Sequence, residues 1–227
     1  RYGSLIVMLA VLILGIVYLH GMAQRSEGKA PASQSETLGA GQETTILESI
    51  EDLKAGQILD AASLDLNDPD KYFTSSQLTE EQKEDMKGKS YIDNPDISYD
   101  DLSCLKVLHY NYEHEIQVGE IVVNTKVAED CRQVFLELFQ EGYEIHSMYR
   151  IDRFYGDDTT RDAEQADIDS INQDNTSAFH YRKIAGTNVT SEHAYGMAID
   201  INPLENPYVP AGDVVATGAS PYLQYDL

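Results

Sequence analysis

The chain has 227 residues and a formal net charge of −23, which argues against nucleic acid as a partner, because phosphate backbones are bound by a surplus of Lys and Arg. The same charge argues against a polybasic patch that would bind a membrane surface. Hydrophobic residues make up 42% of the chain, which is enough for a packed core in at least part of it.

The first residues predict a membrane segment. No residue from Tyr2 to Met22 is formally charged, and a helix of this length spans roughly 30 Å, the thickness of the hydrocarbon core of a bilayer. Arg1 precedes it, as the positive-inside rule expects of an N-terminus left in the cytoplasm. A signal peptide cleaved after Ala23 is the alternative. We therefore expect a single-pass membrane protein with an extracytoplasmic domain, or a secreted one.

Two segments separate this stretch from the main domain. Residues 24–45 contain Leu38 as their only large aliphatic residue, so they bury too little apolar surface to offset chain entropy and predict a flexible linker. Residues 46–77 are expected to be an accessory helical or irregular segment. A modest helix is predicted over 45–62, where apolar residues recur at helical spacing at Ile46, Ile50, Leu53 and Ile58.

Stronger patterns follow from residue 78. A short helix is predicted over 78–87, since Thr79 and Gln82 have the spacing of a capping box. Residues 105–112 and 116–123 predict a β-hairpin that turns at 113–115. A helix capped by Asn124 or Thr125 and ended by Gly142 should then face the core through Val127, Cys131, Val134, Phe135, Leu138 and Phe139.

The next strand is predicted over 143–151, and a long polar loop over 152–175, which carries eight acidic residues and two arginines. A calcium loop is an alternative there, although the EF-hand spacing is absent. The order of hairpin, helix and strand predicts an α+β fold with a small, mainly antiparallel sheet and flanking helices.

The two cysteines, Cys104 and Cys131, lack the CxxC spacing of a zinc knuckle or redox motif. In an exported protein they can form one disulfide, and two buried thiols are the alternative. Neither reading makes them metal ligands.

The residues richest in chemistry are SEHAYGMAIDIN, from Ser191 to Asn202. His193 and Asp200 stand seven residues apart, with Gly196 between them as a turning point. A strand after the turn would direct Asp200 to one face and its neighbouring isoleucines to the other. Imidazole and carboxylate together suit zinc. On the residues alone, a hydrogen-bonded structural pair and a pair of metal ligands both remain open.

The stretch SEHAYGMAID resembles the SxHxxGxAxD signature of the zinc D-alanyl-D-alanine carboxypeptidases of the VanY and VanX kind, and of the related L-alanyl-D-glutamate endopeptidases. The stretches MKGKSY at 86–91, VGEIVVN at 118–124, DNTSAFHYR at 174–182 and HAYGMAIDINPLENPYV at 193–209 are similar to members of the same family. The likeness covers residues 78–227 and implies the Hedgehog/D,D-peptidase type of α+β fold.

The resemblance also implies roles for individual residues. It makes His193 and Asp200 zinc ligands, and Ser191 a contact of the substrate. An arginine stabilises the substrate carbonyl as charge builds on it, with Arg182 as the first candidate and Arg150 as the second. Tyr195 either lines the groove or packs in the core. The implied reaction is hydrolysis of a peptidoglycan stem peptide by a zinc-activated water.

The family further requires a third zinc-binding His and an acidic base after the signature, yet no His follows Asp200 in this sequence. The resemblance therefore implies that both lie beyond Leu227, and that residues 78–227 are an incomplete, inactive domain. His146 or His180 as the third ligand is an alternative. A catalytically inactive wall-binding module and a membrane-tethered interaction protein are the alternative functions.

Overall fold

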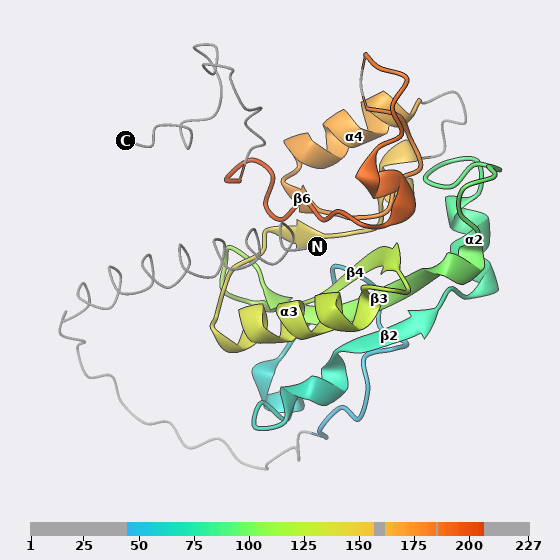
Figure 1. Cartoon of the computed structure of the whole chain (residues 1–227). Helices are drawn as coiled ribbons and strands as arrows, with labels where there is room; N and C mark the ends of the chain where they lie inside the picture. The colour runs from blue at the N-terminus through green and yellow to red at the C-terminus, as the bar shows by residue number, and fades with distance from the viewer. Residues whose placement is uncertain (1–44, 157–161, 185, 207–227) are drawn as a thin grey trace, which may run out of the picture. The chain divides into compact units, whose positions relative to one another are not determined.

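The computed structural model describes residues 45–156, 162–184 and 186–206. The predicted membrane segment at 2–22 and nearly all of the linker lie outside these residues. Within the described ranges, no helix is long and apolar enough to cross a membrane. The described residues belong to one compact unit, which has an α+β fold around a small antiparallel sheet (Figure 1).

The main sheet has four strands in the order β1-β4-β3-β2, and every neighbouring pair is antiparallel. The strands are β1 (Ile58–Leu59), β2 (Thr74–Gln77), β3 (Leu102–Tyr110) and β4 (Ile116–Asn124). β3 and β4 form the predicted hairpin, which is confirmed. In its turn the Asn111 side chain accepts hydrogen bonds from the amides of Glu113 and Glu115.

The predicted core-facing helix is α3 (Ala128–Gln140), which packs on β3 and β2 (Figure 1). Most of the predicted stripe is confirmed: Cys131, Phe135 and Phe139 are buried in the main hydrophobic cluster, and Val127 and Leu138 pack against it, whereas Val134 is not part of it. The predicted cap is wrong, because the N-cap position is Val127. The Asn124 side chain instead accepts from the amide of Lys126, just before the helix begins.

The helix α2 (Glu80–Met86) has the predicted capping box. The Gln82 amide donates to Thr79 Oγ1 at 3.2 Å, and the Thr79 amide donates to Gln82 Oε1 at 2.9 Å. Met86 packs into a second, smaller cluster that also contains Cys104. Cys131 belongs to the main cluster, and both cysteines are free and buried. The two-thiol reading is therefore right and the disulfide reading wrong.

The helix predicted over 45–62 is wrong. This stretch is irregular, except for β1 and the 3₁₀ helix η1 (Ala61–Ser63). The Gly56 amide donates to the Val118 carbonyl at 2.7 Å, and the Val118 amide donates to the Gln57 carbonyl at 3.0 Å. Pairing with the edge of β4 thus supplies the backbone hydrogen bonds, and it outweighs a weak helical periodicity that Gly56, at φ 88°, interrupts.

The second half of the domain differs most from expectation. The strand predicted over 143–151 is reduced to β5 (Ser147–Met148), which pairs in parallel with β6 (Asn175–Thr176). The stretch 152–175 is not simply a loop, because it contains α4 (Ala163–Asn172), capped by Asp162, whose side chain accepts from the Gln165 amide. In Figure 1, α4 lies next to β6.

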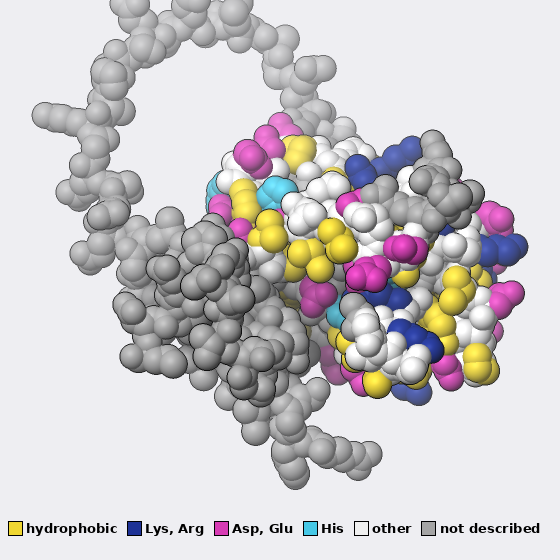
Figure 2. Space-filling model, turned by 90° about the horizontal axis from the view of Figure 1, so that it is seen from above, with side chains coloured by type: hydrophobic (Ala, Val, Ile, Leu, Met, Phe, Trp, Pro, Cys, Tyr) yellow, Lys and Arg dark blue, Asp and Glu magenta, His cyan; other side chains and the backbone are white. Residues whose placement is uncertain are grey.

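Four further 3₁₀ helices complete the described chain: η2 (Pro69–Tyr72), η3 (Tyr99–Asp101), η4 (Ile151–Tyr155) and η5 (Glu192–Tyr195). The surface drawn in Figure 2 intersperses basic side chains with acidic ones, so the acidic excess does not form a single block on that face.

Candidate metal centre

A short segment that starts with the last residue of β6, residues 176–180, holds both candidate ligands by their backbones. Ser177 and Asp200 exchange two backbone hydrogen bonds, of 3.0 and 2.9 Å, in an antiparallel bridge. The His180 amide donates to the His193 carbonyl at 3.0 Å. The segment therefore sets how the His193 and Asp200 backbones lie relative to each other.

The His193 side chain is oriented by the same segment. Its Nδ1 lies 2.7 Å from the carbonyl oxygen of Ala178. Because a carbonyl oxygen only accepts, this contact places the hydrogen on Nδ1 and leaves Nε2 as the nitrogen that can bind a cation. Hydrogen bonds of this kind fix the tautomer and ring orientation of metal-binding histidines.

The free nitrogen points at the candidate carboxylate. His193 Nε2 lies 3.3 Å from Asp200 Oδ2. At this distance the two acceptor atoms are close enough to share one cation. Ligand atoms on a tetrahedral zinc, each about 2.1 Å from the ion, lie roughly 3.4 Å apart. The pair therefore fits two of the ligands of a zinc ion.

The pair is open to solvent on one side. The His193 side chain is 15% exposed and that of Asp200 is 47% exposed. A metal held here would be within reach of water and substrate. The described part of the chain contains no group of three His, Cys, Asp or Glu residues placed to hold an ion.

The chain turns at Gly196, as the sequence predicts. Gly196 ends η5 in the left-handed region, with φ 64°. A Cβ atom at this position would lie 2.6 Å from the backbone nitrogen of Asn124. The Asn124 amide donates to the Gly196 carbonyl, and its side chain donates to the Tyr195 carbonyl. The end of β4 thereby anchors the turn between the two candidate ligands.

The predicted alternation after the turn is also present. Ile199 and Ile201 pack against the main hydrophobic cluster, whereas the side chain of Asp200 between them reaches solvent. Regular pairing at this point is limited to the bridge with Ser177. The isoleucines thus anchor a short extended stretch that presents the carboxylate.

The two candidate arginines are both paired with carboxylates. The Arg182 Nε forms an ion pair with Asp167 of α4. The Arg150 guanidinium lies within 3.0 Å of Asp85, Glu120 and Asp152, and its side chain is 13% exposed. Either arginine would have to share its charge with these acids while acting on a substrate.

Ser191 is the N-cap of η5, and Tyr195 is its last residue. Ser191 is buried, and its Oγ accepts from the His193 amide at 3.3 Å. Its backbone amide donates to the Arg182 carbonyl, so Arg182 is tied to the start of η5. Tyr195 is partly buried. The predicted substrate contacts of Ser191 and Tyr195 stay predictions.

His146 and His180, the alternative third ligands, do not join the His193–Asp200 pair. Both ring nitrogens of His180 are engaged, Nδ1 with Asp167 at 2.7 Å and Nε2 with the Tyr155 hydroxyl at 2.9 Å. Burial lowers the pKa of His180, against the opposing effect of Asp167. The Nδ1 of His146 faces the Gln173 carbonyl at 3.1 Å. Neither joins the His193–Asp200 pair in a three-residue cluster.

Sequence reasoning missed the parts of the site that act through backbone atoms. The Ala178 carbonyl and the Ser177 backbone carry no signal in their residue types. The nearest signal is the stretch DNTSAFHYR at 174–182, which contains both residues.

Comparison with known proteins bears on this region. Residues 185–225 match a family model described as D-alanyl-D-alanine carboxypeptidase. At this coarse level the match supports a peptidase related to peptidoglycan. The matched stretch includes His193 and Asp200, but it covers a small part of the chain. No curated protein and no solved structure matches the chain.

Proposed function

We propose that this chain is a zinc peptidase that hydrolyses the stem peptides of peptidoglycan, with His193 and Asp200 as two of its zinc ligands. The observation that carries the proposal is the geometry of His193. Its Nδ1 is held by the Ala178 carbonyl while its Nε2 lies 3.3 Å from Asp200 Oδ2. Both residues fall within the stretch that matches the carboxypeptidase family model.

In this proposal the chain positions the metal, the substrate and the developing charge. Bound at the pair, zinc would act as a Lewis acid and lower the pKa of a water molecule toward about 7. Arg182 or Arg150 would stabilise the oxyanion that forms on the peptide carbonyl. Ser191 and Tyr195 would contact the peptide. A third ligand and an acidic base would come from residues outside the described ranges.

The proposal places the domain outside the cytoplasmic membrane. Residues 2–22 would anchor it and residues 24–45 would hold it away from the lipid, where the stem peptides are. The uncharged, apolar composition of 2–22 supports this placement.

Zinc binding tests the proposed ligands directly. We expect the native full-length protein to bind Zn²⁺, and His193→Ala and Asp200→Ala each to weaken binding by about 100-fold or more. Loss of an outer partner of a metal ligand typically costs 10- to 100-fold, and a ligand itself should cost more. His146→Ala, which removes an exposed imidazole, should bind as the native chain does. Isothermal titration measures all four proteins. Equal affinities throughout, or no binding by the native full-length protein, would reject the ligands.

Digestion of purified peptidoglycan tests the reaction. We expect stem peptides to be shortened by the native full-length protein and left intact by His193→Ala. Mass analysis of the products separates the two bonds at issue. Loss of a terminal D-Ala indicates a carboxypeptidase, and release of a peptide that begins with D-Glu indicates an L-alanyl-D-glutamate endopeptidase.

An inactive wall-binding module is the second candidate, because the described residues supply only two of the ligands that a catalytic zinc needs. Such a module would sediment with peptidoglycan yet leave its peptides uncleaved. Intact peptides after incubation with the native, zinc-loaded protein would therefore favour the module over the peptidase.

A further inference from the structure

One carboxylate links α4 to the chain around segment 176–180, which holds the His193–Asp200 pair. Asp167 lies near the middle of α4 and accepts a hydrogen bond from Nδ1 of His180 at 2.7 Å. The same carboxylate forms the ion pair with Nε of Arg182. Two residues of the chain that leads from β6 toward η5 are therefore held by a single side chain from another element.

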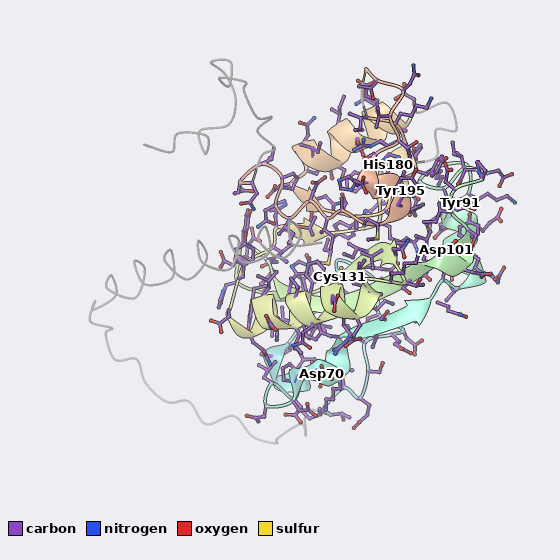
Figure 3. All side chains as sticks on the ribbon, in the orientation of Figure 1. Asp70, Tyr91, Asp101, Cys131, His180 and Tyr195 are labelled. Carbon is purple, nitrogen blue, oxygen red and sulfur yellow. The ribbon has the colours of Figure 1, made fainter. Side chains whose placement is uncertain are left out.

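Both ring nitrogens of His180 have hydrogen-bond partners. A carboxylate only accepts, so the hydrogen of the ring lies on Nδ1 and faces Asp167. Nε2 then accepts from the hydroxyl of Tyr155, 2.9 Å away. The side chain of His180 is 2% exposed, and burial disfavours its charged form. Figure 3 labels this histidine and Tyr195, the last residue of η5.

The apolar packing of α4 centres on Ala166, which is buried in a small cluster with Ile151, Phe154 and Tyr155 of η4. The buried residues of α4 are Ala166 and Ser170, whereas Ile168 and Ile171 are 43% and 41% exposed. Polar bonds add to this attachment: those of Asp167, and the one that Asn175 Nδ2 donates to Ser170 Oγ. Removing Asp167 would release His180 and Arg182 together, and would leave the imidazole of His180 without its acceptor.

Backbone hydrogen bonds connect segment 176–180, which contains His180, to the His193–Asp200 pair. The His180 backbone amide binds the His193 carbonyl, and two residues earlier Ala178 supplies the carbonyl that orients the His193 ring. Ser177 pairs with Asp200. A shift of the 176–180 segment therefore changes both the His193 ring orientation and the position of Asp200.

We infer that Asp167 is a positioning residue: through His180 and Arg182 it fixes segment 176–180, and so it fixes the separation of His193 Nε2 and Asp200 Oδ2. For its effect on metal binding, this inference rests on the proposed function. Its effect on the backbone of segment 176–180 holds whether or not zinc binds.

The experiment compares matched variants of the full chain. Asp167→Ala removes both contacts, and Asp167→Asn keeps one oxygen that can accept from His180 while it loses the charge that faces Arg182. Glu164→Ala is the control, because it removes an exposed carboxylate from the same helix. Amide hydrogen exchange at Ser177, His180 and Asp200 in metal-free protein is the first readout, and zinc affinity is the second.

We expect Asp167→Ala to speed exchange at these three amides about tenfold or more relative to Glu164→Ala. Zinc affinity should fall by about 10- to 100-fold, as it does when outer partners of metal ligands are lost. For both exchange and zinc affinity, the effect of Asp167→Asn should lie between those of Asp167→Ala and Glu164→Ala. If Asp167→Ala fails to fold, Asp167→Asn against Glu164→Gln carries the same comparison.

The outcomes are separable. Unchanged exchange at Ser177, His180 and Asp200 overturns the inference regardless of zinc. Faster exchange with unchanged zinc affinity overturns the claim that Asp167 positions His193 and Asp200 for metal binding, while the proposed function stands. A native chain that binds no zinc overturns the proposed function, and the exchange data alone then decide whether Asp167 positions the segment.

Discussion

Replacing Gly196 by alanine is expected to lower the free energy of unfolding by about 2–4 kcal/mol. Two effects add. A side chain in the left-handed region, at φ 64°, is strained wherever it occurs. In addition, the new Cβ would lie 2.6 Å from the Asn124 nitrogen and 3.0 Å from the Val123 carbonyl carbon. These are backbone atoms, so η5 must move away from the end of β4.

Gly142 provides the matched control for this prediction. It has a similar φ of 70°, but a Cβ there would meet nothing within 4 Å. Gly142→Ala should therefore show the backbone strain alone, about 1 kcal/mol. Urea denaturation of the two variants and the native chain measures the difference. Equal losses at Gly142 and Gly196 would show that the close approach to Asn124 contributes nothing.

The elements that could be predicted from the sequence are those whose patterns are long and local. The hairpin of β3 and β4 combines two long apolar strands with a short turn, and α3 repeats its apolar residues over its whole length. The capping box of α2 needs only two residues at a fixed spacing. In each of these cases the local preference and the tertiary packing agree.

The failures occur where tertiary contacts decide the local structure. Residues 45–62 have a helical periodicity, yet Gly56 and Gln57 pair with the edge of β4 instead. α4 is a helix where a loop was predicted. Its face toward the rest of the domain contains small residues, Ala166 and Ser170, that give no apolar stripe. Such a helix is held by specific polar partners, which a single sequence does not identify.

In the candidate site, too, the local spacing of residues could be predicted and the tertiary contact could not. The spacing of His193, Gly196 and Asp200 predicted a turn that brings an imidazole and a carboxylate to the same place, and the two side chains lie 3.3 Å apart. Their assignment as zinc ligands stays a prediction. The Ala178 carbonyl that orients the imidazole could not be predicted, because every residue type carries a carbonyl.

His109 should make the fold sensitive to acid. Its side chain is buried within β3, at 2% exposure, and its Nε2 has no hydrogen-bond partner. Burial lowers the pKa of His109 from 6.5 to about 4, although hydrogen bonds to the backbone of Tyr110 and Ile145 oppose this. The histidine is therefore neutral in the folded chain at pH values where it is protonated in the unfolded chain.

The direction of the effect follows from that difference in bound protons. Between pH 6.5 and pH 4 the unfolded chain binds the proton at His109 and the folded chain does not, so stability falls as the pH falls. The loss is complete near pH 4 and amounts to about 3 kcal/mol, since one pKa unit corresponds to about 1.4 kcal/mol. Above pH 6.5 the histidine contributes no pH dependence.

Urea denaturation from pH 7.5 to pH 4 measures this loss in the native chain and in His109→Gln. His109→Gln lowers stability at every pH because it disturbs the core, so the change of stability with pH is compared and not the absolute value. The loss of stability over this range should be about 3 kcal/mol smaller in His109→Gln. Carboxylates that titrate below pH 5 contribute equally to both proteins. Parallel curves for the native chain and His109→Gln would mean that the core admits the charged imidazole, and that the buried nitrogen finds a partner when it is protonated.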